Sequence, residues 1–462
     1  MNEKNCLSGV QRTGILITLL AAAFITSMST TVTGNMIPNF TEYFSVSSNL
    51  AQWLTSGATL ISGITIPITA FMIKRTPNKV YFFSAMTAYI IGSLGAFLAS
   101  NFLLLLISRL LQAVGCGMFL SFAQIVLLRI YPKEKHGTIM AGYSMASTIS
   151  SLIAPTYAGL VMDTFSWRGV FVSLFAFGIM VLVSGIIFMK NVTDKEEAEL
   201  NIGYVALSSF GFAAFLIGIS NISGGLFSLK SGGLLLAGLI LLCIFSILQL
   251  KSESPMLNLW VFKYPKFRIA LILSICLYLI AMGNAMICPI FTKSIRGFSD
   301  TAYGVATIFG SLLSVFATFS AGKLYDKVGI KPMFFTGAGL FAVFSVMGMF
   351  LSEQTSIVYI SVLFAFQSVA VAALISPSTA MALSGLEGKE RVDGSAIFNT
   401  LRQISSSLSS TLAVLLFTLM GSNMTAIHKV YGYFGIVTVA IVVVVIIYLK
   451  SEKKQGIERM SK

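Results

Sequence analysis

Fourteen long apolar stretches constrain the fold of this chain more than any other feature of its sequence. Each is about 20 residues long or longer, which is the length an α-helix needs to cross the hydrocarbon core of a bilayer. The stretches lie at about 12–37, 50–73, 79–100, 102–128, 137–160, 168–189, 202–222, 231–250, 268–292, 302–322, 331–351, 355–384, 396–420 and 430–449. We therefore expect an all-α integral membrane protein with fourteen transmembrane helices.

The composition excludes a soluble protein of this size. Charged residues make up only 10% of the 462 residues and hydrophobic residues 56%, with a mean hydropathy of +0.87. A soluble globular domain carries about 25% charged residues. A water-exposed surface of this extent could not be covered with so few charges, so the bilayer is the expected surrounding.

The positions of the basic residues predict the orientation in the membrane. The net charge of +14 comes from 31 Lys and Arg against 17 Asp and Glu. With the N-terminus in the cytoplasm, 25 of the 31 basic residues fall in cytoplasmic segments or at adjoining span edges, and five fall outside. This split follows the positive-inside rule and predicts a multi-pass protein of the cell membrane with both termini cytoplasmic. The charge forms no single footprint, which argues against a nucleic-acid partner.

Two similar segments, 70–79 (AFMIKRTPNK) and 322–331 (GKLYDKVGIK), indicate an internal duplication. At an offset of 252 residues, Arg75 and Lys79 fall on Lys327 and Lys331, and each segment follows the second helix of a block of six. We predict an N-terminal six-helix half at 1–190, a two-helix insert with central loops at 191–266, and a C-terminal six-helix half with a short cytoplasmic tail at 267–462. Parallel halves of this kind place a substrate site near the bilayer midplane between them.

Three motifs occur in order along the chain: SRLLQAVGCG at 108–117, LIAPTYAG at 152–159 and GKLYDKVGIK at 322–331. Together they resemble motifs of the major facilitator superfamily, specifically its fourteen-helix drug:proton antiporter branch. The resemblance implies a six-plus-six pseudo-symmetric bundle with a two-helix insert. It also implies a secondary active transporter that exports amphipathic small molecules by alternating access, coupled to protons.

The resemblance further suggests which residues act in gating and conformational change. They are Gly115, Pro155, Gly159, Gly322, Asp326, Lys327 and Lys331. Each also has a plainer interpretation. Small residues pack membrane helices closely, Pro and Gly are common in membrane helices, and loop lysines fix topology.

The first helix lacks the acidic residue that the family usually carries. Thr31 and Pro38 match the family pattern, but Ser29 stands where the family has Asp. All 17 carboxylates fall in predicted loops or at span edges, whereas proton-coupled carriers normally use buried carboxylates with a raised pKa. The alternative is therefore a uniporter, flippase or carrier for an anionic or lipid-like substrate bound at Arg109, without proton antiport.

Arg109 is the one formal charge deep within a predicted span. Burying it costs about 2.5–3.5 kcal/mol on the membrane-insertion scale, so we expect it to face the protein interior. It could serve as a coupling or anion-binding centre, or it could tie the fourth helix to the first through Ser29 or Thr30. The candidates for substrate or coupling contacts are Arg109, Gln112, Ser29, Thr31, Asn284 and Gln367.

No motif indicates an enzyme, a cofactor or a metal site. The sequence contains no HExxH, no GxxxxGK[ST] and no GxSxG, which are the signatures of metalloproteases, P-loop enzymes and serine hydrolases. The expected partners are a small-molecule substrate, protons and the lipid bilayer, and we expect a monomer. A non-transporting scaffold or sensor on the same fold stays open, and it predicts a central cavity without polar lining.

Overall fold

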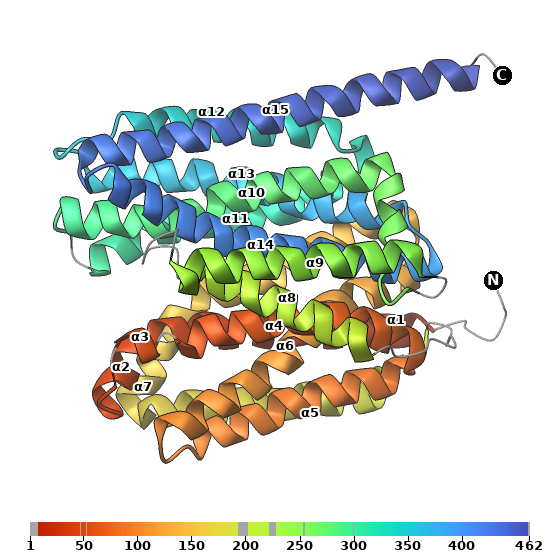
Figure 1. The fold of residues 1–462 in the computed structure, drawn as a ribbon, viewed down its shortest axis with the longest axis horizontal. Coiled ribbons are helices and arrows are strands. Elements are labelled where there is room, and N and C mark those ends of the chain that lie inside the picture. The colour runs from red at the N-terminus through yellow and green to blue at the C-terminus, as the bar shows by residue number, and fades with distance from the viewer. Residues whose placement is uncertain are drawn as a thin grey trace.

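The computed structural model describes residues 8–46, 48–51, 53–192, 202–220, 228–252, 255–298 and 300–460. Within these residues every regular element is a helix (Figure 1). Ten helices are long and apolar enough to cross a membrane, and Trp53–Ile66 and Gly203–Ile219 are shorter apolar helices. The chain is therefore a multi-pass membrane protein, as the apolar stretches predict.

The first group of helices runs from the N-terminus to residue 188. It comprises α1 (Gly9–Asn35), α2 (Ile37–Tyr43), α3 (Ser48–Ala51), α4 (Trp53–Arg75), α5 (Asn78–Phe97), α6 (Phe102–Ile130), the 3-10 turn η2 (Lys133–Lys135) and α7 (His136–Phe188). The predicted fifth and sixth spans follow one another within α7, which breaks at Ser166, where φ is +62°. Side-chain caps mark two starts, because Ser8 accepts from Gln11 N in α1 and Asn101 accepts from Leu104 N in α6.

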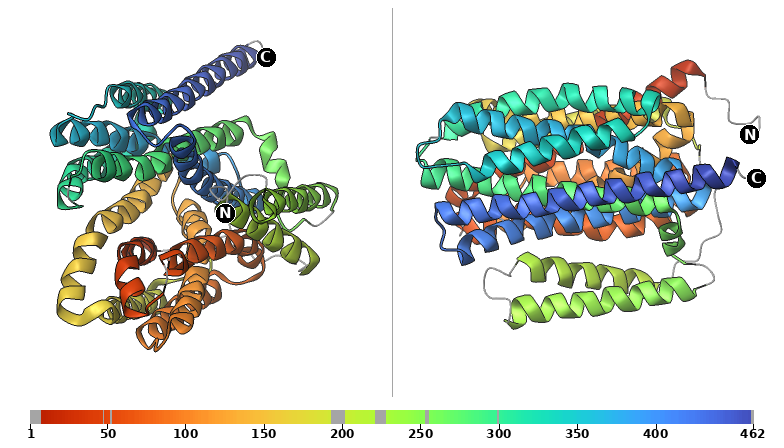
Figure 2. Two further views of the ribbon diagram at one scale, coloured as in Figure 1. Left: turned by 60° about the vertical axis from the view of Figure 1, so that its left-hand side comes forward. Right: turned by 90° about the horizontal axis from the view of Figure 1, so that it is seen from above.

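The second group begins at residue 265. It comprises α10 (Pro265–Pro289), η6 (Ile290–Ile295), α11 (Asp300–Val328), α12 (Lys331–Met349), α13 (Ile357–Ser384), α14 (Gly388–Leu419) and α15 (Met424–Met460). Between the groups lie α8 (Ile202–Ser220), η4 (Leu229–Gly233), α9 (Leu234–Lys251) and η5 (Leu259–Lys263). Figure 2 shows α8 and α9 side by side at the edge of the bundle, where α8 contacts α4 and α14.

Figure 1 shows the start of α1 and the end of α15 at the same end of the bundle, which we call the terminal end. Besides smaller contacts of α7 with α13 and of α6 with α14, the two groups meet mainly along two helix pairs, α4 with α14 and α7 with α11. These pairs correspond to one another, since α14 begins 252 residues after α7 (388 − 136) and α11 ends about as far after α4. The repeat found in the sequence is therefore also a repeat in the way the groups pack.

Glycines allow several of these helices to approach closely. A Cβ at Gly115 would lie 2.7 Å from the carbonyl oxygen of Ala85 in α5. A Cβ at Gly322 in α11 would lie 2.6 Å from the carbonyl oxygen of Gly137 in α7. Real Cβ atoms do not approach this closely, so both glycines are required for the observed packing.

Candidate functional site

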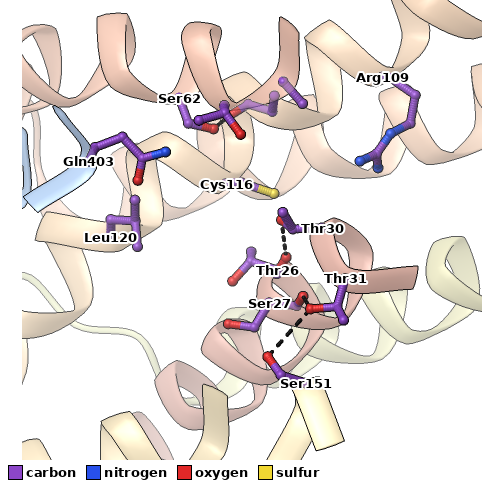
Figure 3. Close-up of a pocket in the computed structure, with 13 residues that line it drawn as sticks. Thr26, Ser27, Thr30, Thr31, Ser62, Arg109, Cys116, Leu120, Ser151 and Gln403 are labelled. Atoms are coloured by element: carbon purple, nitrogen blue, oxygen red, sulfur yellow. Dashed lines mark hydrogen bonds between the residues drawn. The ribbon is translucent and has the colours of Figure 1, made fainter. Parts of the chain in front are cut away.

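A cavity of about 260 Å³ lies among α1, α4, α6 and α7 and is reached from the second group by one side chain of α14 (Figure 3). Nine of its thirteen lining residues are polar and seven of these carry a hydroxyl group, although more of the wall surface is apolar than polar. The lining residues are Thr26, Ser27, Thr30, Thr31, Ala58, Thr59, Ser62, Arg109, Ala113, Cys116, Leu120, Ser151 and Gln403. Two of the predicted substrate contacts, Arg109 and Thr31, are among them.

The hydroxyl groups of the cavity wall are anchored to nearby backbone. Thr30 Oγ1 donates to the carbonyl oxygen of Thr26 at 3.1 Å, and Ser62 Oγ donates to that of Ala113 at 3.1 Å. Thr31 Oγ1 lies 3.1 Å from the carbonyl oxygen of Ser27, and it is also 3.4 Å from Ser151 Oγ. These bonds fix the orientation of the hydroxyl groups toward the cavity.

Arg109 ties α6 to α1 and is only 2% exposed. Its Nη1 donates to Ser29 Oγ at 2.8 Å and to Gln112 Oε1, and its Nη2 lies 3.4 Å from the carbonyl oxygen of Ser29. Its Nε is buried without a hydrogen-bond partner. The ring of Phe171 lies below the guanidinium, with its centroid 6.0 Å from Cζ. The predicted structural tie through Ser29 is thus present, and Arg109 also faces the cavity.

Behind Arg109, Gln112 extends the network to α5. Gln112 Nε2 donates to Ser93 Oγ at 2.7 Å, and Ser93 Oγ donates to the carbonyl oxygen of Tyr89 at 2.8 Å. Tyr89 OH donates to the carbonyl oxygen of Ile25 in α1 at 3.2 Å. Gln112 therefore positions the guanidinium rather than lining the cavity.

Asn284 and Gln367, the other predicted contacts, lie in the second group of helices. Asn284 Nδ2 donates to Gln367 Oε1 at 2.6 Å, and Tyr431 OH donates to Asn284 Oδ1 at 2.8 Å. Both amides are buried, and neither is part of the cavity lining. This network joins α10, α13 and α15.

At the terminal end, a buried ion pair joins α4 to α14. Lys74 Nζ lies 2.6 Å from one carboxylate oxygen of Asp393 and 2.7 Å from the other. Lys74 is 9% exposed and Asp393 is fully buried. The sequence places Asp393 at a span edge, whereas the structure places it in the second turn of α14, between the groups.

The second joint at this end connects α11 to α7. The carboxylate of Asp326 accepts from Gly137 N at 2.8 Å, from Thr138 N at 2.7 Å and from Thr138 Oγ1 at 2.5 Å. A carboxylate in this position caps the first turn of α7 and complements the helix dipole. Lys327 and Lys331 follow on the exposed loop side, so of the predicted gating residues in this loop, Asp326 and Gly322 lie at the joint.

A polar seam between α6 and α14 completes the closed terminal end. Asn399 Nδ2 donates to Gln124 Oε1 at 2.9 Å, and Ser395 Oγ donates to the same oxygen at 3.1 Å. Arg391 Nη1 donates to the carbonyl oxygen of Leu128 at 2.9 Å. At the rim, exposed Lys133 and Glu387 pair at 2.7 Å, and the bond from Lys133 holds the pKa of Glu387 below its ordinary value.

In α7, Gly159 has open space around its Cα, since a Cβ there would meet no atom within 4 Å. The backbone of Pro155 continues the helix, and its side chain lies outside the described part of the structure. A role of either residue in conformational change stays a prediction.

The sequence model of the Major Facilitator Superfamily matches residues 19–277 and 270–459. The chain belongs to this superfamily. It is 31% identical over 406 residues to YcnB of Bacillus subtilis (strain 168), named as an uncharacterized transporter of this type, covering 87% of this chain and 86% of YcnB. It is 29% identical over 406 residues to the lincomycin resistance protein LmrB of the same organism, covering 87% and 84%. It is 22% identical over 438 residues to the multidrug export protein EmrB of Escherichia coli (strain K12), covering 93% and 84%.

Two solved structures have the same fold. The human organic anion transporter MFSD10 matches with a TM-score of 0.68 at 12% identity, covering 93% of this chain and 99% of that one. A double Trp mutant of XylE matches with a TM-score of 0.68 at 14% identity, covering 96% of each chain. The resemblance to the superfamily and its drug:proton antiporter branch, predicted from the motifs, is confirmed.

For this major facilitator chain, sequence reasoning missed Lys74, Asp393 and Gln403 as residues of the interface or cavity. One signal could have found Lys74. At the offset of 252 residues it stands opposite Asp326, so the same place in each repeat carries a charge of opposite sign. Asp393 and Gln403 gave no such signal, because their partners depend on how the groups pack.

Proposed function

We propose that this chain is a secondary active exporter of amphipathic small molecules, of the multidrug-efflux type, that works by alternating access. It lies in the cell membrane with both termini in the cytoplasm, as the distribution of basic residues predicts. The names of LmrB and EmrB support drug export for this chain. We retain a monomer as the expected state.

The proposed topology has fourteen transmembrane helices, in halves at 1–190 and 267–462 with a two-helix insert at 191–266. Ten described helices are apolar enough to span by themselves, and α4 and α8 contain shorter apolar segments. The remaining two spans are the part of α7 before Ser166 and the polar helix α14. Both are rich in Ser, Thr and Gly, because they face the other group rather than lipid, which explains their weaker hydropathy.

The arrangement of the joints carries the proposal of alternating access. The ion pair Lys74–Asp393, the cap by Asp326 and the seam around Asn399 join the two groups at the terminal end. The cavity with Arg109 lies within the first group, and Gln403 of α14 reaches it from the second group. We infer that this is the state closed to the cytoplasm, and that rocking of the groups about the cavity breaks these joints to admit substrate.

Coupling to protons is part of the proposal and is supported by the resemblance to the drug:proton antiporter branch. It is tested with the purified protein in proteoliposomes that contain a pH-sensitive dye, using lincomycin as the first probe. Antiport predicts that adding a transported compound dissipates an imposed pH gradient. Transport of the compound without any pH response would contradict antiport and leave the exporter proposal standing.

A second candidate function has the same fold but no coupling of transport to protons. In it the chain is a uniporter, flippase or carrier for an anionic or lipid-like substrate held by Arg109. The observation that favours it is the set of neutral hydrogen-bond partners of Arg109, a hydroxyl, an amide and a carbonyl. Variants Arg109→Lys and Arg109→Ala discriminate, because this candidate predicts loss of anion binding, whereas the first predicts loss of the pH response. The polar cavity lining speaks against a scaffold, which predicts an apolar one.

A further inference from the structure

Five of the seven hydroxyl groups in the cavity wall already donate a hydrogen bond. A hydroxyl carries one proton and two acceptor lone pairs. The protons of Thr26, Thr30, Ser62 and Ser151 are directed to backbone carbonyl oxygens at 2.9–3.1 Å. The wall therefore presents acceptor oxygens, which match O–H and N–H donors on a ligand.

Arg109 supplies the complementary property at one side of the same cavity. Both protons of Nη1 are committed to Ser29 and Gln112. Nε has no partner, and Nη2 makes one long contact of 3.4 Å. Nε is closed off from the cavity, so Nη2–H is the donor left for an anionic oxygen group, to which a guanidinium makes a charge-assisted hydrogen bond.

The remaining lining residues argue against a lipophilic cation. Among the thirteen lining residues there is no Asp or Glu to balance a cation, and no Phe, Tyr, Trp or Met to stack on an apolar body. A cation in the cavity would face the positive charge of Arg109 in a low-dielectric surrounding, where the repulsion is strong. The volume of about 260 Å³ lies just below the usual range of small-molecule sites, about 300–1,000 Å³, which indicates a small ligand.

We propose that the cavity binds a small hydroxylated molecule that carries one anionic oxygen group, with the anion on Arg109 and the hydroxyl groups on the acceptor oxygens of α1, α4 and α7. This inference rests on the proposed function, because it takes the cavity as the transport site. It narrows the substrate from amphipathic molecules in general to sugar-acid-like molecules.

Cys116 provides a built-in reporter, because its thiol lines the cavity. A variant that keeps only Cys116, with Cys6, Cys243, Cys276 and Cys288 replaced by Ser, is purified in detergent and alkylated with N-ethylmaleimide. The probes are gluconate, glucose and tetraphenylphosphonium. We expect gluconate to slow the alkylation in a saturable way, at concentrations about tenfold lower than glucose requires, and tetraphenylphosphonium to have no effect. A variant that keeps only Cys243, on the exposed face of α9, is the matched control and should not respond.

Two substitutions test the contact with the anionic group and the contact with the hydroxyl groups separately. Arg109→Gln should raise the half-protecting concentration of gluconate about tenfold or more, because a charged hydrogen-bonded pair is lost, and should leave glucose unchanged. Thr30→Val removes one acceptor at constant shape and should raise the half-protecting concentration of gluconate about threefold. Thr164→Val is its control, since that hydroxyl is exposed and bonds only its own helix. If Arg109→Gln does not fold, the result for Thr30→Val decides.

Protection of Cys116 by tetraphenylphosphonium but not by gluconate overturns this inference. Equal protection by gluconate and glucose overturns the role of Arg109 in it. A transport assay distinguishes a failure of this inference from a failure of the proposed function. Export of tetraphenylphosphonium by proteoliposomes without gluconate binding leaves an exporter and removes the sugar-acid site. Gluconate binding without movement of any probe leaves the site and removes the exporter.

Discussion

Lys74 and Asp393 form a buried ion pair between α4 and α14, while Asp326, at the position equivalent to Lys74 in the repeat (74 + 252), caps the start of α7. The two joints therefore lie at equivalent positions of the internal duplication, and the residues at these positions, Lys74 and Asp326, have opposite charges. A carboxylate is stabilised by the N-terminus of a helix, whereas a lysine is repelled by it. Asp393, placed in the second turn of α14, compensates for this repulsion, and the lysine is tolerated.

Breaking this pair should destabilise the protein strongly. Lys74→Ala leaves the carboxylate of Asp393 buried without its cation, at a cost of about 3–5 kcal/mol. The combined exchange Lys74→Asp with Asp393→Lys should recover more than half of the loss. The measurement is thermal unfolding of the purified protein in detergent. Lys133→Ala is the control, because the pair of Lys133 with Glu387 is exposed and its loss should leave thermal unfolding nearly unchanged. Equal losses of thermal stability in Lys74→Ala and Lys133→Ala would show that the buried pair contributes no more to stability than the exposed one.

Packing at the crossing of α7 and α11 should be equally sensitive. Gly322→Ala places a methyl group against Ala141 and the carbonyl oxygen of Gly137, so the two groups must move apart, at about 1–3 kcal/mol. Gly159→Ala is the matched control, since its Cβ meets nothing within 4 Å and should leave stability unchanged or slightly raised. Disulfide trapping between Cys residues introduced at Gln124 and Ser395 measures whether the terminal end stays closed. Unchanged trapping in Gly322→Ala would contradict the role given to this crossing.

Stability should rise with pH just below 6.5 because of His136. This residue is buried at the start of α7, and its Nε2–H donates to the carbonyl oxygen of Tyr131 at 3.1 Å. Burial lowers its pKa below the ordinary 6.5, and this effect, with a smaller one from nearby Arg391, outweighs the hydrogen bond to Tyr131 and the charge of Asp326, which raise the pKa. The unfolded chain therefore binds more protons in this window, so stability grows as pH rises through the folded pKa toward 6.5 and is then constant. His136→Gln should remove this rise in a series of melting curves. If the rise of stability with pH persists in His136→Gln, another titrating group causes it.

Ser29→Asp restores the acidic residue that the family carries in the first helix. The new carboxylate would lie within hydrogen-bond reach of Arg109 Nη1, where Ser29 Oγ is at 2.8 Å. We expect it to neutralise the guanidinium and weaken gluconate binding about tenfold in the Cys116 protection assay. Ser29→Ala, which removes a neutral partner, should leave gluconate affinity within about threefold. A loss in both variants would mean that Ser29 positions Arg109 and that charge is not the cause.

Much of the fold follows from local sequence, because apolar stretches, basic loops and the 252-residue repeat act over short windows. Arg109 was predicted to face the interior on energetic grounds alone, and Ser29 was one of the two partners expected for it, with Thr30. Asn284 and Gln367 were recognised as polar residues within spans, yet they satisfy each other. The pair of Lys74 with Asp393 could not be predicted, since 319 residues separate them and only the packing of α4 on α14 brings them together.

The most direct test of the account is the sidedness of Cys116 in the variant that keeps only this cysteine. Membrane vesicles of both orientations are treated with a membrane-impermeant maleimide, with and without the further substitution Asp393→Ala. Alternating access predicts labelling from the external face and little from the cytoplasmic face, and a shift toward cytoplasmic labelling once the joint at Asp393 is removed. Labelling from the cytoplasmic face with the joint intact, or equal labelling from both faces, would contradict a cavity that opens to one side at a time.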